Sequence, residues 1–149
     1  MNNVAVRNDI QKVEDALLEH PDVHIGDTEA CPLTHEFVEG IYVRTIKIPA
    51  NSLVVGKIHR HAHPNFLMKG VVTVVTEDGG TEILKAPCSM ISPAGTKRVV
   101  FTHMDCEWTT VHATDATTPE EAVLQIVAPS YEDEELNANQ VKALETLCH

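Results

Sequence analysis

The sequence has few aromatic and few basic residues, and the shortage of positive charge excludes two classes of partner. Aromatic residues make up only 4% of the 149 residues, although a hydrophobic content of 43% is enough for a core. Lys and Arg number 11 against 22 Asp and Glu, which gives a formal charge of −11. Nucleic acids and anionic membranes attract clustered Lys and Arg, so we expect neither as a partner.

The sequence also lacks the spacing signals of several protein classes. Four cysteines are present, and they form no CxxC pair: Cys31, Cys88, Cys106 and Cys148. This spacing argues against a zinc finger and against a disulfide framework. No run of about 18 apolar residues predicts a membrane span, and the N-terminus has no basic head typical of a signal peptide. We therefore expect a cytoplasmic protein, with residues 1–149 forming a single domain.

What the sequence does contain is an alternating histidine cluster in residues 59–65. If residues 54–63 form a strand, His59, His61 and His63 point to one face of it. Imidazole is the commonest metal ligand in proteins, and apolar residues flank the cluster on both sides. A solvated polar edge is the alternative. Alternate Cα atoms of a strand are about 6.6 Å apart, so the three histidines of a straight strand are too widely spaced for one ion. One ion can bind all three only if the strand bends or ends near His61.

Short strands separated by turn signals dominate the rest of the chain. An Asn8 N-cap with Gln11 predicts a helix over residues 8–19, followed by a loop over 22–36. The predicted strands cover residues 40–49, 52–63, 71–75, 81–85, 88–92, 97–102, 107–113 and 122–127. Residues 77–80 (EDGG) predict a hairpin turn. An acidic tail over residues 130–149 has the apolar spacing of a C-terminal helix.

This order of elements predicts an all-β fold. Eight or nine short strands with turns between them are typical of an antiparallel jelly-roll barrel. We place the barrel at about residues 36–128, with the helices as appendages at either end. Such a barrel encloses space for a small ligand, and inward-facing histidines would line it.

Two stretches resemble the motifs of the cupin superfamily. Residues 56–70 resemble the first motif, which has a glycine, HxH, a glutamate and a closing glycine, and residues 93–98 (PAGTKR) resemble the second, PxGxxH. The chain looks closest to small single-domain cupin-like proteins, some encoded by phages, with HxxxHxN, GTKR and WTTVH stretches. The resemblance implies a double-stranded β-helix barrel, often dimeric. It also implies a divalent metal held by three histidines and a glutamate.

The chain departs from both motifs at ligand positions. Counting back from Gly70 puts His63 where the glutamate stands, and Arg98 replaces the histidine of the second motif. The best replacement ligand is His112, on the strand predicted near the second motif, and His103, in a predicted turn, is the alternative. We therefore predict a divalent transition metal, namely Zn, Fe, Ni or Mn, held by His59, His61, His63 and His112. Glu82 or Glu107 could supply the missing carboxylate.

Three further residues are candidates for contact with a substrate. An inward Arg98 would hold a carboxylate or phosphate through two hydrogen bonds, whereas an outward one would form a surface ion pair. Asn65 would contact substrate, orient a histidine or serve as a turn residue. Tyr42 would offer a phenol to the pocket or pack in the core.

Three functions fit these observations. The first is a metal-dependent enzyme of the dioxygenase, isomerase or lyase type, acting on a small polar or anionic metabolite. The second is a cupin that binds a ligand without turning it over. The third is an interaction protein whose barrel only scaffolds an assembly. In each case we expect a homodimer, because the sheet edges of a single-domain barrel need covering.

Overall fold

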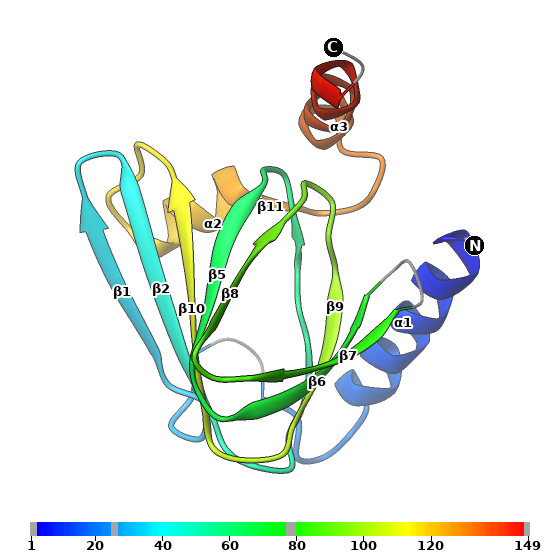
Figure 1. The fold of residues 1–149 in the computed structure, drawn as a ribbon, viewed down its shortest axis with the longest axis vertical. Coiled ribbons are helices and arrows are strands. Elements are labelled where there is room, and N and C mark those ends of the chain that lie inside the picture. The colour runs from blue at the N-terminus through cyan, green and yellow to red at the C-terminus, as the bar shows by residue number, and fades with distance from the viewer. Residues whose placement is uncertain (1–2, 25–26, 77–79, 148–149) are drawn as a thin grey trace.

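Two antiparallel sheets face each other and enclose a barrel in the computed structural model, which describes residues 3–24, 27–76 and 80–147 (Figure 1). The larger sheet has the order β1-β2-β10-β5-β8. Its strands are β1 (Leu33–Val38), β2 (Ile41–Ile48), β10 (Cys106–Ala113), β5 (His63–Lys69) and β8 (Cys88–Ser92). The chain thus has the predicted jelly-roll architecture.

The opposite wall is a four-stranded sheet with the order β3-β9-β6-β7. Its strands are β3 (Leu53–Val55), β9 (Arg98–Thr102), β6 (Val71–Thr76) and β7 (Thr81–Lys85). A short ladder joins β4 (Ile58–His59) to β11 (Val127–Ala128). The predicted hairpin turn at residues 77–80 lies mostly outside the described residues, but the β6 and β7 strands that flank it do pair antiparallel.

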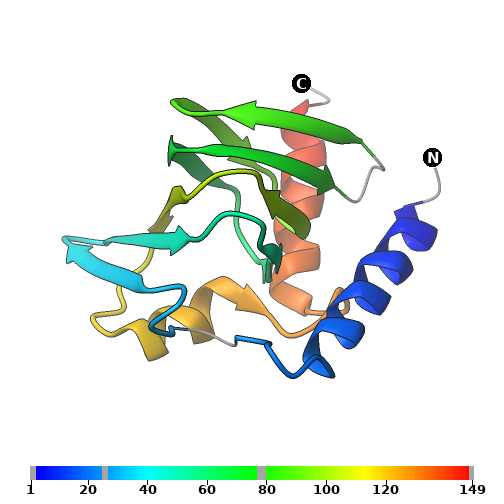
Figure 2. The ribbon, with the colours of Figure 1, turned by 90° about the horizontal axis from the view of Figure 1, so that it is seen from below.

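Three helices lie outside the sheets: α1 (Asn3–Leu18), α2 (Pro119–Ile126) and α3 (Glu134–Leu147) (Figures 1 and 2). The N-terminal helix begins at Asn3, so Asn8 lies inside it and is not its N-cap. None of the helices in the described ranges is long and apolar enough to cross a membrane.

The strand predicted over residues 122–127 is wrong, because α2 occupies most of that stretch. Thr118 caps this helix by accepting a hydrogen bond from the Glu121 backbone N–H, and Pro119 opens its first turn. Ala122 and Ile126, four residues apart, are both buried, which is helical spacing. Only Val127 continues into a strand.

The single histidine strand predicted over residues 52–63 is also wrong. The chain forms β3, passes through residues 56–57, forms the two-residue β4, and bends at Arg60 and His61 before β5. Pro64 is the second residue of β5, where a missing N–H donor is tolerated. The predicted loop over residues 22–36 is likewise shorter, since β1 begins at Leu33.

The barrel interior changes from apolar to polar along its strands. At one end a buried aliphatic cluster fills the space between the sheets, with members Ile48, Leu67, Val72, Val74, Val100, Cys106 and Trp108. Alternation along β5 then places Asn65 and His63 beyond Leu67, on the same inward face. Along β10, Thr110 and His112 follow Trp108 in the same way. The polar side chains therefore gather at the other end of the barrel.

The C-terminal helix is fastened to the bend between β4 and β5. Arg60 Nη2 and Nε donate to the two carboxylate oxygens of Asp133 at 2.9 and 3.0 Å, just before α3 begins. Asn139 Nδ2 donates to the Arg60 carbonyl at 2.8 Å. Leu136 is fully buried in a small cluster with Ile58 and Ala128. The bend at residues 60–61 is thus fixed by both the side chain and the backbone of Arg60.

Candidate metal centre

Three histidines from three strands meet at the polar end of the barrel. His59 comes from β4, His63 from β5 and His112 from β10. Their ring centroids are 4.4 to 5.3 Å apart, and one nitrogen from each lies within 4.8 Å of the other two. His63 and His112 are only 4% and 5% exposed. Small side-chain rotations would bring three such nitrogens onto one ion.

Each of these imidazoles is held by a hydrogen bond through one ring nitrogen. His63 Nδ1 donates to the His61 carbonyl at 3.2 Å, and His112 Nε2 pairs with Thr110 Oγ1 at 3.0 Å. His59 hydrogen-bonds the backbone of Lys57. Such outer partners fix the orientation of a metal-binding imidazole and leave its other nitrogen available.

The environment keeps the three imidazoles neutral. Burial is the main cause that lowers the pKa of His59 to about 3, and a proton there would also be repelled by Arg44 and by any second protonated histidine. Burial and the same kind of neighbours lower the pKa of His112 to about 3. The pKa of His63 is lowered by burial and by the charge of Arg98, against an opposing hydrogen bond to His61. Neutral imidazole is the form that binds a metal, so the group fits a divalent transition ion.

No carboxylate joins the three histidines among the residues that the structure describes. Glu82 is exposed on β7, and Glu107 lies 3.9 Å from Lys47 near the surface. The group is therefore a three-nitrogen set. An ion bound there would keep positions open for a ligand and would retain its full charge.

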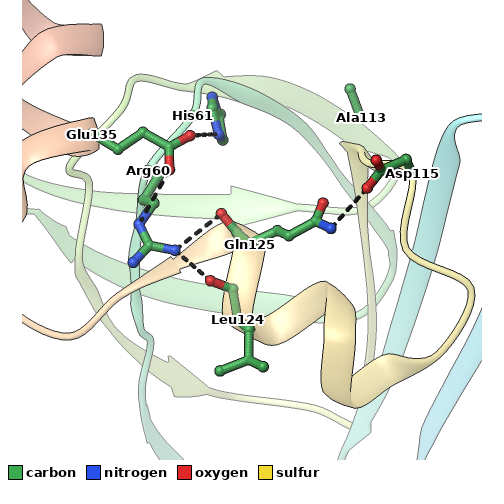
Figure 3. A pocket seen from close by; sticks show the side chains of 7 residues that line it. All are labelled: Arg60, His61, Ala113, Asp115, Leu124, Gln125 and Glu135. Carbon is green, nitrogen blue, oxygen red and sulfur yellow. Dashed lines mark hydrogen bonds and ion pairs between the residues drawn. The ribbon is translucent and has the colours of Figure 1, made fainter.

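His61, the fourth predicted metal ligand, lies outside this group. It sits in the bend between β4 and β5, where its Nε2 is 3.0 Å from Glu135 Oε1 (Figure 3). The two side chains face a surface cavity of about 380 Å³, which is lined by Arg60, His61, Ala113, Asp115, Leu124, Gln125 and Glu135. The alternation of histidines in the sequence therefore does not correspond to one strand face.

Arg98 belongs to a chain of hydrogen bonds next to the histidines. Its Nη1 donates to Ser92 Oγ at 2.5 Å, and Asn65 Nδ2 donates to the same oxygen at 2.6 Å. Trp108 Nε1 in turn donates to Asn65 Oδ1 at 3.1 Å. Arg98 has no ion pair with any described acidic residue, and its charge acts on His63. It therefore lies beside the site and is not engaged in a surface ion pair.

Asn65 and Tyr42 lie beside the histidines but use their polar groups internally. Asn65 is 2% exposed within β5, so it is not a turn residue. The hydroxyl of Tyr42 is hydrogen-bonded to His35 Nδ1 at 2.6 Å, and its ring centroid is 6.0 Å from that of His112. His35 therefore supports Tyr42 from the neighbouring strand β1.

Two polar residues of this region were missed by sequence reasoning: Ser92 and Arg44. Ser92 is fully buried at the end of β8, and nothing in its sequence context distinguishes it from other strand serines. Arg44 follows Tyr42 by two positions in a strand that was predicted correctly, so the alternation of side chains places both on one face. The two-residue repeat of a strand could therefore have identified Arg44 as a neighbour of Tyr42 from the sequence.

Comparison with solved structures identifies the fold. Ectoine synthase from P. lautus superposes with a TM-score of 0.56 at 12% identity, covering 78% of this chain and 92% of that one. Salicylate 1,2-dioxygenase from Pseudaminobacter salicylatoxidans superposes with a TM-score of 0.54 at 13% identity. The match covers 76% of this chain and 34% of the dioxygenase. The Cnp3 cupin domain of Schizosaccharomyces pombe superposes with a TM-score of 0.50 at 17% identity. The match covers 61% of this chain and 69% of the Cnp3 domain.

Sequence comparisons add nothing to this result, because neither protein-family models nor curated proteins match the chain. At identities this low, structural likeness establishes a shared fold and leaves activity open. The chain has the cupin fold, as its two motif-like stretches predicted.

Proposed function

We propose that this cupin-fold protein binds a divalent transition metal through His59, His63 and His112 and uses it to act on a small anionic metabolite. The observation that supports the proposal most strongly is the convergence of three neutral imidazoles, two buried and one half-buried, from β4, β5 and β10, each with an outer hydrogen-bond partner. Histidines that only pack in a core do not have to bring three ring nitrogens together in this way. The metal would be Zn, Fe, Ni or Mn.

The residues around the ion suggest how a ligand would be held. A divalent ion in this site supplies a Lewis acid that polarises an oxygen of the ligand or activates water. Arg98, fixed by Ser92, would bind the anionic end of the ligand through its remaining N–H donors. The aliphatic cluster beyond Asn65 closes the inner end of the barrel and so excludes water from that side.

A ligand-binding protein without catalytic turnover is the second candidate. It is favoured by the lack of an acidic residue in the described histidine group, because proton transfer in a metal site commonly uses a carboxylate or a free base. If the protein is an enzyme, its proton acceptor would therefore have to be a group of the ligand or a water molecule bound to the metal. The third candidate, a scaffold without metal, has no observation in its favour at this site.

The finer assignments from the sequence are also proposals. We propose that the chain belongs to the small cupin-like proteins of phage and bacterial type and forms one domain. A cytoplasmic location is consistent with Cys31, Cys88 and Cys106, all of which are free thiols. We further propose that the protein is a homodimer.

Elemental analysis of protein purified without a histidine tag tests the proposed metal site. We expect close to one equivalent of a transition metal in the wild type and a large loss in His59→Ala and His63→Ala. His61→Ala is the matched control, because it removes an adjacent imidazole that faces Glu135 and should keep full occupancy. Full occupancy in all three variants, or loss only in His61→Ala, would contradict the proposal.

A further inference from the structure

Arg44 lies on the barrel wall beside the histidine group. It is on β2 between Tyr42 and Ile46, which share its inward face, and its Cα is paired with that of Thr110 on β10. Thr110 hydrogen-bonds His112, so Arg44 stands one strand away from that ligand. Its side chain is partly buried. Arg44 therefore presents a cation to the barrel interior.

The guanidinium of Arg44 has no hydrogen bond or ion pair within the described part of the chain. Arg60, in contrast, is bound on both edges of its guanidinium by Asp133 and by backbone carbonyls. Asp27 acts on Arg44 only through its charge, without a direct contact. Because every fully enclosed side-chain N or O atom in the described residues has a partner, the Arg44 head group retains access to solvent. It can accept a ligand.

Arg44 and Arg98 approach the histidines from opposite sides. In the sheet order β2-β10-β5-β8, His112 and His63 lie on the two middle strands. Arg44 is on β2, and Arg98 reaches over from β9 to Ser92 on β8. Three strand spacings of about 4.8 Å separate β2 from β8, or about 14 Å. The positive charge of Arg44 acts on His59 and His112, and that of Arg98 acts on His63.

We infer that Arg44 and Arg98 bind the two ends of a small organic acid with two anionic groups, held across the histidine-bound metal. This inference rests on the proposed function and names its ligand class. Two guanidiniums and a divalent ion would otherwise share a space in which no carboxylate contacts them directly, and such unpaired charge is costly where solvent is restricted. A ligand with one anionic group would neutralise only one side. A dicarboxylate offers one carboxylate to each guanidinium, and the planar fork of Arg can bind a carboxylate through two hydrogen bonds.

Ligand binding to the zinc-loaded protein tests the inference. Calorimetric titration at fixed ionic strength would compare acetate with malonate, succinate and glutarate. We expect at least one dicarboxylate to bind ten times more tightly than acetate. Arg44→Met should remove that advantage, and Arg44→Lys should restore it in part, because Lys keeps the charge but loses the planar fork. Lys47→Met is the matched control, since it removes a cation from the outer face of the same strand and should change nothing.

The outcomes separate this inference from the proposed metal site. If zinc binds with one equivalent but dicarboxylates bind no better than acetate, or Arg44→Met binds them unchanged, the inference is overturned and the metal site stands. If the protein takes up none of zinc, iron, nickel and manganese, the proposed function fails first. A dicarboxylate that still binds metal-free protein through Arg44 would then support the arginine pair alone. Equal losses in Arg44→Met and Lys47→Met would indicate a general charge effect and overturn the inference.

Discussion

Trp108 donates its indole N–H to Oδ1 of Asn65 across neighbouring strands, at 3.1 Å. This bond joins the two halves of the barrel interior, because Trp108 belongs to the aliphatic cluster and Asn65 precedes the histidines along β5. The Asn65 amide then donates to Ser92, which also receives Arg98. The position of the Arg98 guanidinium thus depends on a chain of hydrogen bonds that begins at Trp108 in the core.

Replacing Asn65 with Leu should destabilise the protein by about 2 to 4 kcal/mol. The indole N–H of Trp108 would lose its acceptor while buried, and an unmet buried donor costs about 1–3 kcal/mol in addition to the lost bonds. Denaturant unfolding measures the change. Asn65→Asp is the comparison, because it keeps an acceptor for Trp108 but loses the donor to Ser92. A loss below about 0.5 kcal/mol in Asn65→Leu would show that the network is not needed for stability.

The metal-free protein should become less stable as the pH falls below about 6. The folded-state pKa values of His59 and His112 are about 3, below the usual 6.5, so the unfolded chain binds more protons between these values. Each histidine then lowers the free energy of unfolding by at most about 1.4 kcal/mol per pH unit through this window. Chemical unfolding at several pH values measures the slope. His112→Asn should reduce it, and an unchanged slope would contradict the assigned burial.

Gly70→Ala should destabilise the fold by roughly 2 kcal/mol or more. Gly70 has a φ of +98°, which disfavours any residue with a Cβ atom. A Cβ at this position would also lie 2.7 Å from the Asp105 carbonyl oxygen and collide with the Cys106 sulfur. Thermal unfolding tests this, with Gly40→Ala as control, since Gly40 has a similar φ of +83° but open space around it. Equal losses would show that backbone strain alone is responsible.

Light scattering at micromolar concentration should give twice the chain mass of 16.4 kDa. Phe66, Met68 and Ile91 lie on the outer face of the larger sheet and are 36%, 59% and 66% exposed, which is an apolar surface that a second copy would cover. Met68→Asp should therefore shift the protein to a monomer. Leu144→Asp, on the exposed side of α3, is the control that should remain dimeric. A wild-type monomer would contradict this prediction.

The sequence predicted the barrel well because strand alternation and turn residues are local signals. The strands β2, β6, β7, β8, β9 and β10 fall within a residue or two of their predicted bounds. The site was harder, since it depends on where a strand stops. Alternation grouped His59 with His61, but β4 ends at His59 and the bend turns His61 toward Glu135. His112 was found only through its place near the second motif.

Asp133 and Asn139 hold the bend at residues 60–61, so the histidine group can reach its final geometry only after these two residues have been synthesised. The His61 carbonyl that orients His63 belongs to this bend, and the bend is held by Asp133 and Asn139. All three histidines leave the ribosome before those two residues do. The nascent barrel therefore carries these histidines for some time without the restraint that holds the bend. Final adjustment of the histidine group therefore has to wait until Asp133 and Asn139 have emerged and bound the bend.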